Sequence, residues 1–425
     1  MSAPNVRLDL FDRVEKPVSN GLLGVLLLLA ALGAAAFIWL ISGGNPERGW
    51  QIFLVNFLVF TGVSLGAVVF TAATSLSKAK WTGPLRRIAE GFIFFLPVSY
   101  LFFWFVILGR EHIFPWVHMH EPLVEAKRAY LNAPFLMIRG GVGLALLYLL
   151  GWSLVKTSLR PDLAAIKDRL TGFRRTLAER ITEGWQGEEA EAELMRHKRS
   201  RLAPQFVLLY AIVVTFFSFD MVMSLLPTWF STLFGAYYFM GGFLSGLAAI
   251  GIATVLLRRR YGLQDVITKS QFHDHGKLMF GFCVFWGYLM YSQFLVVWYG
   301  NLPLETQFLA IRRYPMWTAL SIGVFCCLFL IPFWGLITRA AKMNPITHAL
   351  FAGVILVGIF LERFDLVIPS LNQKPVSFPF GLPELVVTVG FLALFILCYI
   401  AFMRTFPIVP LTGLPKHAEH ASGNV

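Results

Sequence analysis

The stretch HDHGKLMFGFCVFWGYLMYSQFLVVWYGN, from His273 to Asn301, places titratable side chains at the start of a long apolar run. Lys277 closes the charged group, and residues 278–299 are almost entirely apolar or aromatic. An α-helix needs about 20 such residues to cross roughly 30 Å of hydrocarbon. The stretch therefore predicts a membrane-spanning helix whose charged entrance either anchors in lipid headgroups or begins a path for a charged species.

The composition of the whole chain indicates an integral membrane protein. Of its 425 residues, 57% are hydrophobic and only 14% are charged, which leaves too little charge to solvate one soluble domain. Ten apolar runs are long enough to cross a membrane as helices. They lie near residues 20–42, 50–76, 85–108, 133–155, 204–226, 232–257, 278–299, 315–338, 345–364 and 383–405.

These runs predict an all-α fold, a polytopic membrane helical bundle of about ten transmembrane helices. Barrel strands would show alternation over about ten residues instead. We expect an N-terminal arm over 1–19, a ten-span domain over 20–405 and a C-terminal tail over 406–425. With both termini cytoplasmic, 27 of the 36 Lys and Arg residues fall on the cytoplasmic side, which is the positive-inside pattern. The net charge of +12 thus reflects topology and headgroup attraction, and we expect no nucleic-acid partner.

The longest connection, residues 156–203, lies on the cytoplasmic side in this topology. Apolar residues recur there every three or four positions from Leu163 to Trp185 and predict one amphipathic helix. Such a helix lies on the inner leaflet or on a partner protein, or it only connects the fourth and fifth spans. The acidic run GEEAEAE and the basic run RHKRSR that follow it predict a solvated turn and a membrane stop signal.

The sequence carries no ligand set for a resident redox centre. Its four cysteines all lie within spans and form no C-x-x-C arrangement, so we expect no iron–sulfur cluster, covalent haem or structural zinc. Of the nine histidines only His348 lies within a span, whereas a buried b-type haem usually takes facing histidines from two spans. Motifs for ATP and for dinucleotides are absent from the sequence. We therefore expect no cofactor in this chain, and metal centres in partner subunits if the protein takes part in redox chemistry.

Polar residues on the seventh run form a file along one helix face. Lys277, Tyr288 and Tyr291 fall within a stripe roughly 100° wide, together with Gly281, Ser292 and Leu295. We expect this stripe to face the bundle interior as a proton path, with His273 and Asp274 beside Lys277 at its cytoplasmic mouth. The alternative is that Lys277 snorkels to the inner headgroups while the tyrosines are ordinary packing groups.

A second polar group lies near the outer ends of the fourth and fifth spans. Arg139 and Asp220 are each about seven residues from the outer end, which puts both about 10 Å below the surface. We expect a buried ion pair between them, which serves either as a proton-accessible group or as a static clamp. Ser224, one turn from Asp220, is a candidate hydrogen-bond partner for it. For the ERFD segment, Glu362 to Asp365, we expect local and rim ion pairs.

Three segments carry a resemblance to a known family. They are SFDMVMSLLPTWFSTLFGAYYFMGG (Ser218 to Gly242), the HDHGKLMFGF helix, and YSQFLVVWYGNLPLETQF (Tyr291 to Phe308). They closely resemble the ActF family of membrane proteins in bacterial Alternative Complex III, which belongs to the NrfD-like, polysulfide-reductase membrane-subunit superfamily. The family pattern has two acids after the proline that follows the seventh span. This chain has Leu304 and then Glu305, so the resemblance implies a role for Glu305 alone.

The resemblance implies a multi-pass subunit of a quinol:electron-acceptor oxidoreductase in the bacterial cytoplasmic membrane. Such a subunit is not catalytic alone, and it serves assembly and, by hypothesis, proton translocation. The implied partners are a sister NrfD-like subunit with the quinol site, a multihaem cytochrome c subunit, iron–sulfur subunits and membrane lipids, with a terminal oxidase as a further candidate. By motif, His273, Asp274 and Lys277 form the inner acid and base group, and Asp220 and Glu305 the outer one.

Two other functions fit the same sequence. One is a stand-alone secondary transporter, whose helices are typically broken by Gly or Pro near the midplane. Pro97 in the third span and Pro332 in the eighth fit that description. The other is a purely structural subunit of the complex.

Overall fold

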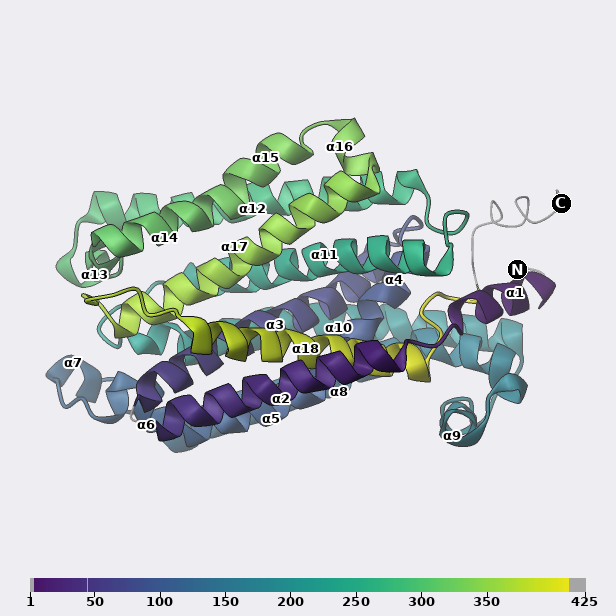
Figure 1. The fold of residues 1–425 in the computed structure, drawn as a ribbon, viewed down its shortest axis with the longest axis horizontal. Coiled ribbons are helices and arrows are strands. Elements are labelled where there is room, and N and C mark those ends of the chain that lie inside the picture. Colours follow the sequence, from purple (N-terminus) through teal and green to yellow (C-terminus); the bar gives the residue numbers. More distant parts are fainter. Residues whose placement is uncertain (1–3, 44, 413–425) are drawn as a thin grey trace.

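The computed structural model describes residues 4–43 and 45–412, and this part of the chain consists of helices and connecting segments without a β-strand (Figure 1). The first nine helices are α1 (Pro4–Val14), α2 (Asn20–Ser42), α3 (Pro46–Leu76), α4 (Gly83–Glu90), α5 (Leu96–Leu108), α6 (Arg110–Ile113), α7 (Pro122–Glu125), α8 (Ala133–Ile166) and α9 (Gly172–Ile181). The others are α10 (Glu188–Met221), α11 (Phe234–Tyr261), α12 (Lys269–Gly300), α13 (Pro303–Arg312), α14 (Pro315–Phe325), α15 (Ile331–Leu336), α16 (Arg339–Met343), α17 (Pro345–Leu371) and α18 (Leu382–Thr405).

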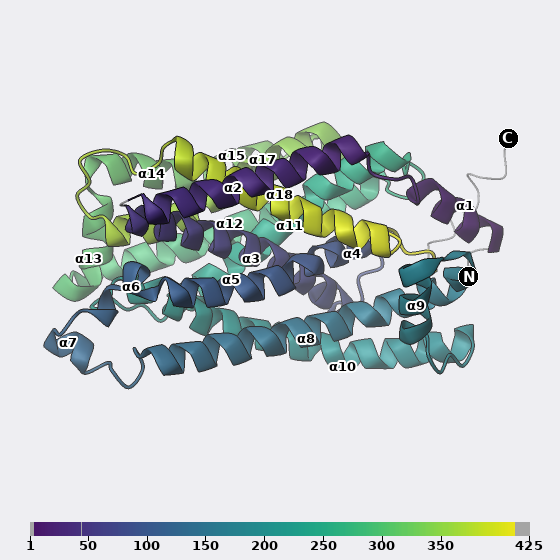
Figure 2. The same ribbon diagram turned by 60° about the horizontal axis from the view of Figure 1, so that its bottom comes forward.

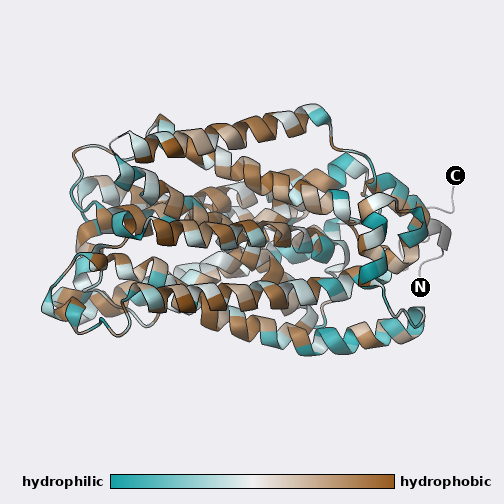
Figure 3. Ribbon diagram, turned by 90° about the horizontal axis from the view of Figure 1, so that it is seen from below, coloured by the Kyte–Doolittle hydropathy of each residue, from teal (hydrophilic) through white to brown (hydrophobic). Residues whose placement is uncertain are grey.

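The chain is an all-α polytopic membrane protein, as the sequence predicts. Among the described residues, nine helical segments are long and apolar enough to cross a membrane, and they contain nine of the ten expected runs. The tenth run, near 345–364, lies in α17, a 27-residue helix that packs against α11 and is not one of the nine. Apolar residues follow the middle of the long helices, and hydrophilic residues gather toward their ends (Figure 3).

Helices α3 and α11 form the centre of the bundle. The apolar part of α3 is 94% buried inside the chain and that of α11 is 72% buried. The two helices approach closely because small residues line their contact: a Cβ atom on Gly66 would lie 2.0 Å from the carbonyl oxygen of Gly242. Only glycine fits there, and such close backbone approach is a common way for membrane helices to pack.

Three groups of helices surround this centre (Figures 1 and 2). Helices α2 and α18 pack against each other, with Gly33 directly against Gly390. Helices α8 and α10 lie side by side along another edge, and α5 packs on α8. Helices α12, α14 and α17 form the third group, which contacts the centre at α11 and, through α17, also at α3. The polar sites described below lie in the second and third groups.

The two ends of the bundle differ in their short helices. We call the end with α1, α4 and α9 the inner end and the end with α6, α7 and α13 the outer end, following the expected orientation (Figure 1). The arm helix α1 lies at the inner end, where Arg169 pairs with its Asp12 and Arg174 pairs with Glu15 just after it. Residues 406–412 of the expected tail pack at the same end. Residues 413–425 of that tail lie outside the described part.

The long connection differs from the expected single amphipathic helix. Helix α8 continues to Ile166, a short 3₁₀ turn follows, and α9 is a separate helix that begins at Gly172. The acidic run, for which we expected a solvated turn, forms the start of α10 instead, and the basic run expected as a membrane stop signal follows it in the same helix. Glycines make the breaks, because Gly172 and Gly187 have φ angles of +56° and +102°, which other residues rarely adopt.

Pro97 and Pro332, the two prolines considered as helix breaks, each follow a turn that is not α-helical. Pro97 lies just after the 3₁₀ turn Gly91–Phe95, and Pro332 just after the π turn Cys326–Leu330. Proline has no N–H and its ring clashes with the preceding turn, so a local change of helix type accommodates it. Both spans continue as hydrogen-bonded turns on either side of the change.

Candidate functional site

The expected ion pair between Arg139 and Asp220 is present between α8 and α10. Arg139 Nη2 donates to Asp220 Oδ1 at 2.7 Å, and Arg139 Nε donates to Oδ2 at 3.1 Å. The Asp220 side chain is only 2% exposed and that of Arg139 is 12% exposed. This two-bond geometry is the strong form of an arginine–carboxylate contact.

Tyr130 completes the surroundings of this pair. Its carbonyl oxygen accepts from both terminal nitrogens of Arg139 at 3.3 Å, and its ring lies 3.8 Å from the guanidinium carbon. Burial raises the pKa of the Tyr130 hydroxyl, with a further contribution from the charge of Asp220. Ser224 does not reach the carboxylate, because its hydroxyl donates to the backbone carbonyl of Asp220 at 2.6 Å. The expected hydrogen bond to the Asp220 side chain is therefore absent.

The polar file on α12 faces away from the rest of the chain, so the expectation of an interior path along it is wrong. Tyr288 and Tyr291 are 59% and 58% exposed, and Gly281 has no neighbouring atom within 4 Å of where a Cβ would lie. The opposite face packs inward, and its glycines allow the contact: Gly276 lies against Lys342 and Gly287 against Phe329.

The expected inner acid and base group lies at the inner end of α12, partly exposed. Lys277 Nζ is 2.7 Å from Asp274 Oδ1, and His273 Nδ1 is 3.9 Å from the same oxygen. The Lys277 side chain is 56% exposed. Glu305 lies far along the chain in α13 at the outer end, with its carboxylate near Gly300. The structure thus brings together the members of the expected inner group but joins Glu305 to neither Asp220 nor the tyrosines by any contact in the described part.

A histidine pair that sequence reasoning missed lies buried between α12 and α17. His275 Nδ1 is 3.0 Å from His348 Nε2, and the side chains are 1% and 0% exposed. His348 Nδ1 lies 3.3 Å from the Lys342 carbonyl, which can only accept, so that nitrogen carries a proton. In the neutral pair His348 Nε2 is therefore the acceptor, and His275 Nδ1 donates to it. The three groups form a directed hydrogen-bond chain.

Lys342 closes the inner side of this pair. It lies in α16, and its ammonium donates to the carbonyls of Leu336 and Ile337 at 2.8 and 3.0 Å. Burial lowers the pKa of Lys342, and the positive charge of Lys277 lowers it further. Lys342 thus contacts His348 through its carbonyl, while its ammonium is held by the carbonyls of Leu336 and Ile337.

A buried charged group lies further along the same two helices. Glu362 and Arg363 on α17 are each 1% exposed, and Trp286 Nε1 on α12 donates to Glu362 Oε1 at 2.9 Å. Arg363 Nη1 lies 3.1 Å from Glu362 Oε2, while its Nη2 donates to the Tyr238 carbonyl at 3.2 Å. The expected local ion pair is present between Glu362 and Arg363, but its expected place at the rim is wrong, because α17 turns both side chains toward α11 at Gly241.

Asp365, one turn beyond Glu362, borders a pocket of about 400 Å³ between α12, α13, α14 and α17. Arg312 Nε donates to Asp365 Oδ2 at 2.9 Å, and Ser321 donates to Oδ1 at 3.0 Å. The other pocket walls are mostly apolar and aromatic. Asp365 and Arg312 thus bring buried charge to the wall of this pocket, which lies in the outer half of the bundle.

Two sequence signals mark the buried face of α12 in retrospect. Gly276 and Gly287 are eleven residues apart, three helical turns, and His275 and Trp286 have the same spacing beside them. Small residues at whole-turn spacing are typical of close helix contacts in membranes. The tyrosines of the opposite face gave the stronger polar pattern but lie outside the bundle.

Among the described residues no group of three or more His, Cys, Asp or Glu side chains is placed to hold a metal ion. No protein-family model matches the sequence, and no curated protein matches it either.

Proposed function

We propose that this chain is a membrane subunit of a bacterial quinol:electron-acceptor oxidoreductase and that it moves protons between the two ends of α12 and α17. The first part rests on the sequence resemblance. Quinol oxidation and the haem c and iron–sulfur centres belong to partner subunits in this proposal. The second part rests on the buried polar groups, because ionisable side chains inside a membrane bundle are costly and mark ion or proton paths.

The observation that carries the proposal is the placement of two buried titratable groups on the same pair of helices. The His275–His348 pair lies toward the inner end, and Glu362 with Trp286 lies further out. On α17 they are separated by 14 residues, or about 21 Å. A purely structural role would be met by apolar side chains, which pack at no desolvation cost.

Proton entry would use the partly exposed group on α12. Asp274 and Lys277 form a partly exposed charged pair at the inner end, and Lys342 contacts the histidine pair through its backbone carbonyl. Within the pair a proton can pass between His275 Nδ1 and His348 Nε2, but the Lys342 carbonyl only accepts, so transfer between the pair and the exposed group on α12 needs water. The buried side chains of α17 between His348 and Glu362 are apolar, as at Ala352 and Ile355, so water must enter this stretch for transfer to continue.

The deciding experiment is Glu362→Gln in the intact complex reconstituted into vesicles, with quinol oxidation and proton uptake measured separately. Glutamine keeps an oxygen that accepts from Trp286 but cannot carry the proton. We expect proton uptake to be lost while quinol oxidation continues. Glu384→Gln is the matched control, because Glu384 is equally buried, pairs with Arg48 and lies on α18 outside the path. Unchanged proton uptake in Glu362→Gln would overturn the path.

A stand-alone secondary transporter is the second candidate, favoured by the irregular turns before Pro97 and Pro332. Both are short 3₁₀ and π turns inside otherwise continuous helices, so they give this candidate weaker support than broken helices would. Copurification separates the candidates: haem absorbance and several subunits support the complex, and a stable isolated chain supports the transporter.

A further inference from the structure

We propose that a pocket at the outer end of the chain binds the phosphate of a phospholipid beside Lys127, with an acyl chain along α10. This proposal is independent of quinol oxidation and of proton movement. It concerns a space of about 350 Å³ between the segment that connects α7 to α8 and the last turns of α10.

Lys127 is held at this pocket from two sides. The connecting segment contributes Lys127 to the wall, and α10 contributes Phe219. Lys127 Nζ donates to the carbonyl of Pro227 at 2.6 Å and lies 5.6 Å from the centre of the Phe230 ring, which also lines the pocket. An ammonium group has three N–H donors, so two remain for a ligand.

The charge of Lys127 has no carboxylate partner in the described part of the chain. Burial lowers the pKa of Lys127, and no nearby carboxylate opposes that shift among the described residues. The acids of this end are engaged elsewhere. Asp220 pairs with Arg139. Glu125 pairs with Arg128.

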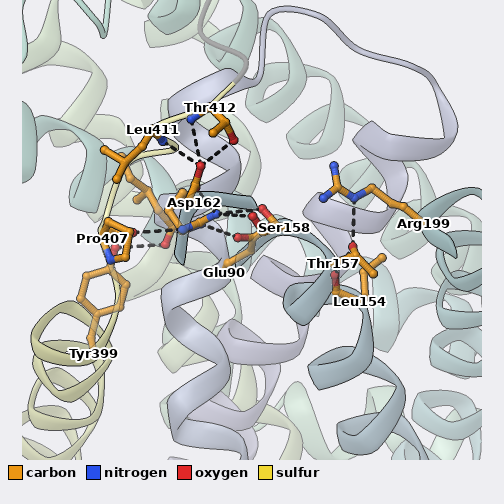
Figure 4. A network of polar contacts seen from close by, with 12 residues as sticks. Glu90, Leu154, Thr157, Ser158, Asp162, Arg199, Tyr399, Pro407, Leu411 and Thr412 are labelled. Carbon is orange, nitrogen blue, oxygen red and sulfur yellow. Dashed lines mark hydrogen bonds and ion pairs between the residues drawn. The ribbon is translucent and has the colours of Figure 1, made fainter. Parts of the chain in front are cut away.

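Arg87, a buried cation at the inner end, shows how this chain balances such a charge. It pairs with Glu90 and Asp162 at 2.8 Å each, within the polar network of Figure 4. Lys127 has a carbonyl oxygen and an aromatic ring instead. An anion from outside the chain would supply the missing counter-charge.

Trp229 adds a second donor to the wall of the same pocket. Trp229 is 3% exposed, and its buried indole N–H has no acceptor in the described structure. A buried donor without an acceptor is costly, and a phosphate oxygen is a suitable acceptor. The cation and this N–H group together suit an anionic ligand.

The pocket lies at the depth of lipid phosphates. The fifth apolar run ends near residue 226, and Pro227, which accepts from Lys127, follows directly. The ammonium therefore lies at the outer boundary between hydrocarbon and water. Trp229 and Tyr130 also line the pocket, and tryptophan and tyrosine are enriched at this boundary.

An apolar stripe on α10 leads from the pocket into the hydrocarbon. Its members follow at spacings of four, four and three residues and lie within about 80° around the helix axis: Leu208, Ile212, Phe216 and Phe219. Phe219 lines the pocket, and its ring centroid is 6.4 Å from that of Phe216. The first three are 64%, 48% and 44% exposed. The stripe is about 16 Å long, roughly the hydrocarbon depth of one leaflet. A free phosphate would use none of this surface, whereas an acyl chain would cover it.

The test measures lipid binding to the purified full chain in neutral detergent by native mass spectrometry. The probes are phosphatidylglycerol, diacylglycerol with the same acyl chains, and glycerol phosphate. We expect phosphatidylglycerol to bind more tightly than diacylglycerol, because only the first carries the phosphate. Glycerol phosphate in large excess should not displace it, because it lacks the chains that cover α10.

Lys127→Gln should weaken phosphatidylglycerol binding roughly fivefold, the contribution of one basic residue, and leave diacylglycerol binding unchanged. Lys127→Arg keeps the charge and should bind phosphatidylglycerol as the unmodified chain does. Trp229→Phe keeps a ring but removes the N–H donor, and should also weaken phosphatidylglycerol binding about fivefold.

The matched control is Lys374→Gln, which removes an exposed lysine from the connection between α17 and α18, outside the pocket. It should bind phosphatidylglycerol as the unmodified chain does. Equal phosphatidylglycerol affinity of Lys127→Gln and the unmodified chain would overturn the site. Displacement of the lipid by glycerol phosphate would reassign the pocket to small anions and overturn the lipid proposal.

Discussion

His275 and His348 face each other across the contact between α12 and α17, with 3.0 Å between Nδ1 of the first and Nε2 of the second. Phe272 lies edge-on to the His348 ring, and Gly251 on α11 leaves room for both imidazoles, since a Cβ there would lie 3.0 Å from His348 Nε2. The pair is therefore enclosed by three helices, and only its hydrogen-bond chain leads outward to the carbonyl of Lys342.

We predict that His275→Gln and His348→Gln each abolish proton uptake by the intact complex while quinol oxidation persists. The double variant should be no worse than either single variant, because a relay fails when one member is lost. Proton uptake and quinol oxidation in reconstituted vesicles measure the two effects separately. Single variants that each lose half of the uptake, with additive loss in the double variant, would contradict a relay.

The Arg139–Asp220 pair predicts that removing one partner lowers the stability of the complex and that removing both restores much of it. Asp220→Ala leaves a buried guanidinium without its carboxylate, and breaking such a pair costs about 3 to 5 kcal/mol. Replacing both residues with apolar ones removes the uncompensated charge and should recover much of the assembled complex. The yield and melting temperature of the purified complex measure this. If the single and double variants are damaged equally, the pair is not what stabilises the contact between α8 and α10.

Substitutions of Lys277 distinguish a role in proton transfer from a role as an anchoring charge. Because its side chain is 56% exposed and paired with Asp274, we expect Lys277→Arg to behave as wild type in both quinol oxidation and proton uptake. Lys277→Met removes the charge and should slow proton uptake. Arginine stays charged at accessible pH. Loss of proton uptake in Lys277→Arg, with the complex still assembled, would show instead that the lysine itself exchanges the proton.

The absence of a redox ligand set from the sequence predicts how the isolated chain behaves. We expect the purified chain to show no Soret band, and deletion of its gene to lower quinol-oxidising activity by removing or destabilising the complex. Visible spectra of the isolated chain and activity of membranes from the deletion strain are the measurements. A haem or iron–sulfur spectrum from the chain alone would contradict the assignment of these centres to partners.

The sequence alone determined the helical spans and one buried contact. The spans follow from run length, because crossing a bilayer requires a fixed number of apolar residues. The Arg139–Asp220 pair follows from depth, since both residues lie the same number of turns from the outer surface on consecutive spans. The breaks before α9 and α10 needed the positive φ angles of Gly172 and Gly187, which the amphipathic pattern did not reveal.

Only the tertiary structure decided which face of each span is buried. In a soluble protein the apolar face of a helix turns inward, but lipid tails are as apolar as leucine, so hydrophobicity does not orient a helix within a membrane. The tyrosine file of α12 therefore gave no reliable direction, and the contacts of Gly276 and Gly287 turned it outward. The same packing brought His275 to His348 and Trp286 to Glu362, pairs that lie 73 and 76 residues apart in the chain.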